Sequence, residues 1–297
     1  MEPAIELSKT RDFGEAISDS FLFVRQNLKP LLSAFFIFCG FFLLAGTVIG
    51  IMQQMKASDM FNNIDTDGTF VTENRYDASF IIASILVGLL SLLFYIILPV
   101  TILSFMALYK EKGNVAPSND ELWGYIKYYF LKVLGGSILN FLLLMCGFLC
   151  CFIPGIYLYP ILGLVFPIMI IENTTYGYAF SQSFRLIKEH WWMVFGVLFI
   201  TGLLISICAG VLTIPFQAVN VWNIFLHKFN RVHISTFSIV IGTILRELAL
   251  VLYILPTVAL GICYFSLTEI KDATGLMGRI NQLGDNNADT NAPAEEY

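Results

Sequence analysis

The chain has 297 residues, a net charge of −5 at pH 7, 57% hydrophobic residues and 13% charged residues. Soluble domains carry about a quarter charged residues, so this composition excludes a water-soluble globular fold and predicts that lipid solvates much of the surface. No block of basic residues indicates a nucleic-acid partner.

Six apolar runs are long enough to cross a membrane, because a span needs about 20 mostly apolar residues. The runs are uninterrupted, which predicts helices, since the strands of a membrane barrel alternate polar and apolar residues. We therefore predict an all-α integral membrane protein with its membrane domain at 1–271 and a disordered polar tail at 272–297. The predicted transmembrane helices are 31–52, 79–109, 134–152, 156–171, 192–214 and 237–267.

Lys and Arg residues are unevenly divided between the two sides of these spans. Twelve lie in the N-terminal segment, the second and fourth connections and the tail, whereas four lie in the first and fifth connections. The positive-inside rule then predicts that both termini are cytoplasmic. The first 30 residues lack the pattern of a signal peptide, so we expect the first span to direct insertion.

The sequence also repeats itself. Residues 13–21 (Phe-Gly-Glu-Ala-Ile-Ser-Asp-Ser-Phe) match 176–184 (Tyr-Gly-Tyr-Ala-Phe-Ser-Gln-Ser-Phe) at five positions. Apolar residues in both segments recur at helical spacing, and a weaker copy begins at Trp123. We predict three pseudo-repeats, each an interfacial amphipathic helix followed by a helical hairpin. In the alternative interpretation, each amphipathic segment is the polar start of a longer span.

Prolines recur in the second helix of each predicted hairpin. Two of them end similar stretches, Tyr-Ile-Ile-Leu-Pro and Tyr-Ile-Leu-Pro. Proline clashes with the preceding helical turn, so we predict kinks that shape the bundle. The alternative is broken helices that form a transporter binding site, with 156–171 as the candidate. These helix-kink prolines are Pro99, Pro160, Pro167 and Pro256.

Three acidic or basic residues near the predicted helices are candidate functional residues. Arg246 and Glu247 fall inside the last predicted span, where ionisable residues suggest function. Counting about 20 residues back from its inner end places both at the outer interface, so we expect interface anchoring, with a partner charge or a transport role as alternatives. Neighbouring residues point about 100° apart on a helix, which predicts poor mutual pairing. Glu172 is predicted to end a helix at the inner surface.

Two stretches carry a family resemblance. One is the repeated Gly-x-Ala-x-Ser-x-Ser-Phe segment, and the other is Phe-Ile-Pro-Gly-Ile-Tyr at 152–157, whose Pro-Gly pair we expect to form the outer turn of the middle hairpin. With Pro-Ile-Met-Ile-Ile-Glu at 167–172, they resemble the membrane domain of glycerophosphodiester phosphodiesterases and related six-span bacterial membrane proteins of unknown function. The resemblance covers about residues 10–270 and implies a helical bundle in the bacterial inner membrane. It implies no phosphodiesterase activity, because a separate soluble domain carries the chemistry in those enzymes.

The residues themselves show no recognisable catalytic or cofactor motif. The six cysteines lie in apolar runs, where Cys packs as a small hydrophobic residue. We therefore predict no enzyme, no catalytic, cofactor-binding or metal-binding residues and no cofactor. The leading hypothesis is a non-enzymatic inner-membrane protein that acts on membrane lipids or on other membrane proteins. The alternatives are a small-solute transporter or channel, and a membrane enzyme with an unrecognised site.

Overall fold

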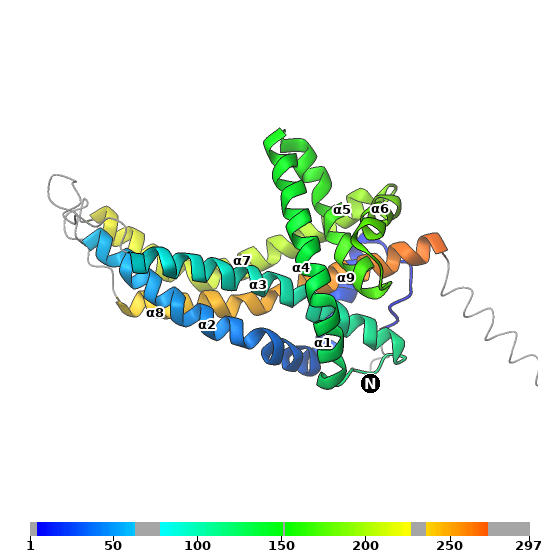
Figure 1. Cartoon of the computed structure of the whole chain (residues 1–297), viewed down its shortest axis with the longest axis horizontal. Coiled ribbons are helices and arrows are strands. Elements are labelled where there is room, and N and C mark those ends of the chain that lie inside the picture. Colours follow the sequence, from blue (N-terminus) through cyan, green and yellow to red (C-terminus); the bar gives the residue numbers. More distant parts are fainter. Residues whose placement is uncertain (1–4, 63–77, 151, 227–235, 273–297) are drawn as a thin grey trace, which may run out of the picture.

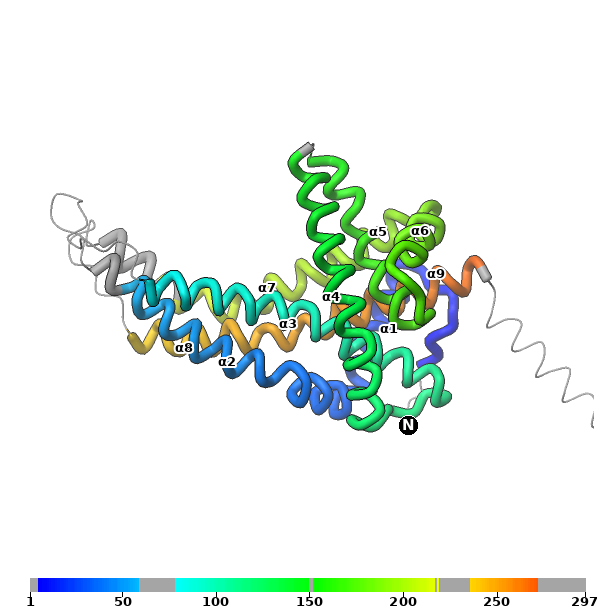
Figure 2. The backbone as a smooth tube through the Cα atoms, viewed as in Figure 1, coloured from blue at the N-terminus to red at the C-terminus, as the bar shows by residue number. Residues whose placement is uncertain are grey.

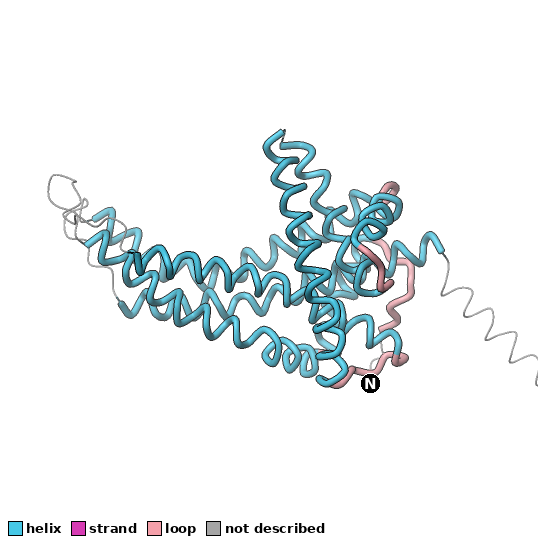
Figure 3. Tube along the Cα trace, viewed as in Figure 1, coloured by secondary structure: helices cyan, strands magenta, loops and turns pink. Residues whose placement is uncertain are grey.

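The computed structural model of the chain (Figure 1) describes residues 5–62, 78–150, 152–226 and 236–272. The described residues form helices and connecting loops, and none of them lies in a strand (Figure 3). The all-α prediction is therefore confirmed. Of the predicted tail at 272–297, Asp272 is the last residue of α9, and the rest lies outside the described residues. The helices are α1 (Phe13–Gln26), α2 (Leu28–Asn62), α3 (Ala78–Glu111), α4 (Asn119–Cys150), α5 (Phe152–Ile171), α6 (Tyr176–Ile187), α7 (Trp191–Leu226), α8 (Thr236–Ala249), the 3₁₀ segment η1 (Leu250–Tyr253) and α9 (Ile254–Asp272).

Within the described residues, six helical segments are long and apolar enough to cross a membrane, which confirms the predicted number of spans and makes the chain a multi-pass membrane protein. The helices that contain three of these spans, α2, α3 and α7, have 34 to 36 residues. At 1.5 Å per residue each is about 50 Å long, more than the roughly 30 Å of hydrocarbon. They must tilt or extend beyond the apolar layer. The spans are Leu28–Ser58, Ala78–Glu111, Asn119–Leu149, Phe152–Ile171, Trp191–Phe216 and Thr236–Lys271.

The spans form an elongated bundle with a side branch (Figures 1 and 2). In the bundle, α2 packs on α3 and α8, while α9 packs on α3 and α7. The α4–α5 hairpin stands away from this bundle, and its base packs against α3 and α9. The short helices α1 and α6 gather with the C-terminal end of α9 at one end of the bundle.

The middle hairpin differs from the prediction in two ways. The amphipathic segment that begins near Trp123 is not a separate helix, because α4 continues from it into the span without a break. The predicted Pro154–Gly155 turn is also wrong, since both residues lie in the first turn of α5. A proline fits there because the first four N–H groups of a helix lack helical acceptors. Gly155 instead permits close helix packing: its Cα lies 3.2 Å from where a Cβ on Gly147 of α4 would stand.

The amphipathic helices α1 and α6 pack through small residues. The matched positions Ala16 and Ala179, like Ser20 and Ser183, are all fully buried, whereas Phe21 in the predicted apolar stripe is 44% exposed. Small side chains let α1 approach α9 and α6 approach α5 closely. Phe21 therefore lies largely outside the buried face of α1, whereas Phe180 and Phe184 of α6 are half-buried against the core.

The N-terminal segment is fastened by a buried arginine. The side chain of Arg11 has no exposed surface, and its Nε donates to Asp19 Oδ2 at 2.7 Å. Its Nη1 donates to the carbonyls of Leu7 and Lys9 at 2.8 and 3.0 Å, and its backbone N–H donates to Ser266 Oγ on α9 at 2.9 Å. A buried guanidinium is tolerated because it is paired and hydrogen-bonded.

Replacing Arg11 by Lys should destabilise the protein by about 2 kcal/mol, because an ammonium cannot reproduce a planar fork of donors and leaves buried acceptors unpaired. Thermal unfolding in detergent measures this loss. Arg185→Lys is the matched control, since Arg185 is exposed on α6. Equal melting temperatures for the two variants would contradict the structural role assigned to Arg11.

Gly147→Val should force α4 and α5 apart, because the new side chain would meet the backbone of Gly155. We expect a loss of about 1–3 kcal/mol, the usual cost of overpacking. Gly135→Val on the same helix carries the same cost in helix propensity, but no atom lies within 4 Å of its Cβ position. The difference between the two variants in thermal unfolding therefore isolates the helix contact, and no difference would rule the contact out as a stabilising one.

Candidate functional site

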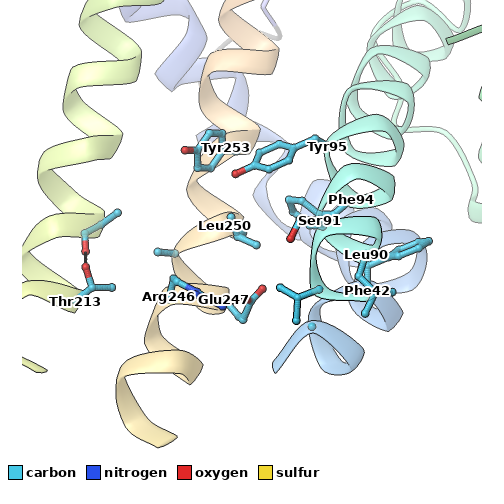
Figure 4. A pocket seen from close by; sticks show the side chains of 14 residues that line it. Phe42, Leu90, Ser91, Phe94, Tyr95, Thr213, Arg246, Glu247, Leu250 and Tyr253 are labelled. Atoms are coloured by element: carbon cyan, nitrogen blue, oxygen red, sulfur yellow. Dashed lines mark hydrogen bonds and ion pairs between the residues drawn. The ribbon is translucent and has the colours of Figure 1, made fainter. Parts of the chain in front are cut away.

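A chamber of about 300 Å³ lies inside the bundle, between the α2–α3 pair and the α7–α8 pair (Figure 4). Most of its lining is apolar, including Phe42, Leu90 and Phe94. A smaller set of polar side chains converges on it from α3, α7, α8 and η1. This combination of apolar walls with a few placed polar groups is typical of ligand-binding sites. The polar lining residues are Ser91, Tyr95, Thr213, Arg246, Glu247 and Tyr253.

Arg246 and Glu247 form an ion pair in this chamber, with Arg246 Nη2 lying 2.9 Å from Glu247 Oε1. The prediction of poor mutual pairing is therefore wrong. Although neighbouring side chains leave a helix about 100° apart, the long side chain of Arg246 reaches the carboxylate of Glu247. The Arg246 side chain is 42% exposed and that of Glu247 only 14%, so the carboxylate is the more enclosed partner.

Two glycines of α2 make room for the pair. A Cβ on Gly46 would stand 3.5 Å from Glu247 Oε2, and one on Gly50 would stand 3.2 Å from Arg246 Nη2. The spacing of four residues puts both glycines on the same face of α2, where α2 packs against α8. Small residues at this spacing commonly let membrane helices approach closely. Here they also form a notch beneath two charged side chains.

Two tyrosines close the end of the chamber toward α9. Tyr95 of α3 and Tyr253 of η1 meet edge to face, with ring centroids 5.9 Å apart. They are the first residues of the two similar stretches that end in Pro99 and Pro256. Pro256 lies in the first turn of α9, directly after the 3₁₀ segment. Because proline removes a helical hydrogen bond and clashes with the preceding turn, it accounts for this interruption in the last span.

The other predicted kink prolines lie inside continuous helices. Pro99 is within α3, and Pro160 and Pro167 are buried within α5. The 156–171 segment is therefore not broken. Two further grooves, of about 370 and 490 Å³, lie where the α4–α5 hairpin leaves the bundle, and Pro256 lines both. Their linings are mainly apolar.

Glu172 lies away from the chamber, one residue past the end of α5. Tyr264 of α9 donates a hydrogen bond from its hydroxyl to Glu172 Oε1 at 2.9 Å. The structure thus brings Arg246 and Glu247 together and leaves Glu172 at a helix end, where it links α5 to α9. In the described part of the chain, no cluster of three or more His, Cys, Asp or Glu residues could hold a metal ion.

Several residues of the chamber were not among the predicted functional residues. The Gly-x-x-x-Gly spacing at Gly46 and Gly50 was a visible signal, and so was the repeated Tyr before each Leu-Pro pair. Ser91 and Thr213 had no signal, because isolated hydroxyl residues are common in membrane helices, where they can bond to their own backbone. Thr213 does so, donating to the Ala209 carbonyl at 2.9 Å.

Comparison with known proteins gives no match: no family model fits the chain, and no curated protein or solved structure is significantly similar to it. Any functional conclusion must therefore rest on the geometry of the site. The chamber offers one cation, one anion, hydroxyl groups and aromatic edges inside an otherwise apolar bundle. Such a lining can bind a small polar or charged group while excluding most of the surrounding water.

A double-mutant cycle should show that Arg246 and Glu247 are coupled by about 1 kcal/mol. Each of Arg246→Met and Glu247→Leu should destabilise the protein, because it leaves an unpaired charge among apolar helices. The double variant should be less destabilised than the sum of the two single variants. The partial exposure of Arg246 keeps the expected coupling modest. Thermal unfolding in detergent gives the three values, and simple additivity would contradict the pairing.

Proposed function

We propose that this protein is a non-enzymatic, multi-pass membrane protein that binds membrane lipid through its helical bundle. The observation that supports this most is the charged chamber within a bundle of apolar spans. Ionisable groups at membrane depth are costly, and proteins that retain them commonly use them for a ligand or an ion. A lipid is the ligand that such a bundle meets most often.

The exposed surface of the spans supports the same proposal. In the most apolar part of α2, α3, α4 and α7, less than a third of the residues are buried. The helices α3 and α7 line opposite walls of the chamber. Over their described lengths, these two helices do not pack closely on one another. We infer that a lipid enters the chamber between these two helices from the hydrocarbon layer.

The proposal also covers the membrane location, the orientation of the termini and the internal repeats. We infer a bacterial inner-membrane location with both termini cytoplasmic, from the distribution of Lys and Arg and the family resemblance. We also infer that the chain consists of internal repeats. The equal burial of Ala16 with Ala179 and of Ser20 with Ser183 supports this, because matched residues then perform the same packing task. Other membrane proteins are further candidate partners.

A small-solute transporter is the second candidate, and the polar lining of the chamber favours it. The transporter hypothesis predicts a polar cavity near the four prolines. The groove beside Pro99 and Pro256 instead has a mainly apolar lining, with Asn140 among its few polar residues. Both hydrogen-bonding ends of that Asn140 amide are engaged, by the Leu162 carbonyl at 3.0 Å and the Tyr176 hydroxyl at 2.8 Å. Lipid binding therefore remains the better-supported function.

Native mass spectrometry of the full chain, released from detergent, should show specifically retained phospholipid. The retained lipid should survive exchange through two detergents of different headgroup chemistry. Many different lipid adducts at low abundance, or protein without lipid in every detergent, would contradict specific lipid binding. Uptake of labelled small solutes into proteoliposomes, dependent on this protein, would instead support the transporter.

Reporter fusions test the proposed orientation. An alkaline phosphatase moiety, which is active only outside the cytoplasm, should be inactive when fused after Lys271, and a green fluorescent protein at the same position should fluoresce. The expectation follows from the excess of Lys and Arg on the side of both termini. A phosphatase-active fusion at this site would reverse the assignment.

A further inference from the structure

The chamber presents a cation and an anion next to each other, and both retain unused hydrogen-bonding capacity. A guanidinium has five N–H donors and a carboxylate has two acceptor oxygens. The bond between Arg246 Nη2 and Glu247 Oε1 uses one of each. A ligand that itself carries both signs can therefore bind the two side chains at once, and neither charge loses a partner in the process.

We propose that the chamber binds the zwitterionic phosphoethanolamine headgroup of a phospholipid, with the phosphate on Arg246 and the ammonium group on Glu247. Arg binds phosphate well because its planar donors match the oxygens of that group. The ammonium group pairs with the enclosed carboxylate, and the ring of Tyr95 or Tyr253 can add a cation–π contact. This assignment rests on the proposed lipid-binding function and names its ligand class.

The acyl chains have an apolar path beside the chamber. A headgroup enters between α3 and α7, and its chains then lie along the apolar surfaces of those helices, in whose most apolar parts only 22% of the residues are buried. A phospholipid with an anionic headgroup that lacks an amine would place no cation on Glu247. That carboxylate is only 14% exposed, so it would discriminate against such a lipid.

The test uses the full-length protein, delipidated in detergent, and short-chain dihexanoyl lipids as probes in native mass spectrometry. Dihexanoyl-phosphatidylethanolamine should bind about tenfold more tightly than dihexanoyl-phosphatidylglycerol. Glu247→Gln should abolish this preference while phosphate binding persists, and Arg246→Gln should weaken both lipids about tenfold. Glu189→Gln and Lys188→Gln, which change exposed charges outside the chamber, should bind both lipids as the natural chain does.

A second variant protects the test against misfolding of the charge variants. Gly46→Leu adds bulk beside Glu247 and changes no charge, so it should also weaken binding of the ethanolamine lipid, whereas Gly88→Leu, at an open position on α3, should not. Size-exclusion profiles and circular dichroism check that each variant is folded.

The outcomes separate the two proposals. Retained lipid without headgroup preference, or equal binding by the natural chain, Glu247→Gln and Gly46→Leu, would overturn the headgroup assignment and leave lipid binding standing. No retained lipid in the natural chain would overturn both. Tight binding of free phosphoethanolamine, equal to that of the lipid, would show that the chamber recognises a soluble ligand. The assignment of a membrane lipid as the ligand would then be wrong.

Discussion

An ion pair among apolar helices is the constraint on which the bundle depends. Arg246 and Glu247 cannot face hydrocarbon without a large cost in free energy, so the surrounding helices must leave space for them and supply partners. Gly46 and Gly50 provide that space on α2 because they have no side chains. The remaining wall residues keep the chamber apolar, which strengthens the attraction between the two charges. The chamber is thus a consequence of how the pair is accommodated.

The break in the last span belongs to the same arrangement. A continuous helix would carry α8 directly into α9, but Pro256 interrupts it and a 3₁₀ segment intervenes. That segment holds Tyr253 against Tyr95, which closes the chamber on one side. At the far end of the bundle, the backbone N–H of Arg11 donates to Ser266 and so joins the N-terminal segment to α9. The last helix is therefore tied at one end to the N-terminal segment and interrupted at the other by proline.

The α4–α5 hairpin shows how packing overrides local sequence signals. Its Pro-Gly pair is typical of a turn, yet both residues lie inside α5, because a proline is tolerated in the first helical turn and Gly155 is needed for contact with Gly147. The amphipathic start of α4 likewise joins the span, since no residue between them ends the helix. This contact lies near the tip of the hairpin, away from the bundle, where Leu149 and Ile153 are 77% and 78% exposed.

The sequence by itself determined the six apolar spans, the all-helical class and the candidate residues Arg246 and Glu247, because hydropathy and length are local properties that lipid enforces on every span. It did not determine which faces of α1 and α6 are buried, nor that two neighbouring charges would meet over a glycine notch on α2. Those features depend on which helix lies opposite, and on long-range contacts such as that between α2 and α8. Only the tertiary structure decides such contacts, because the same apolar stripe can face lipid or another helix at similar cost.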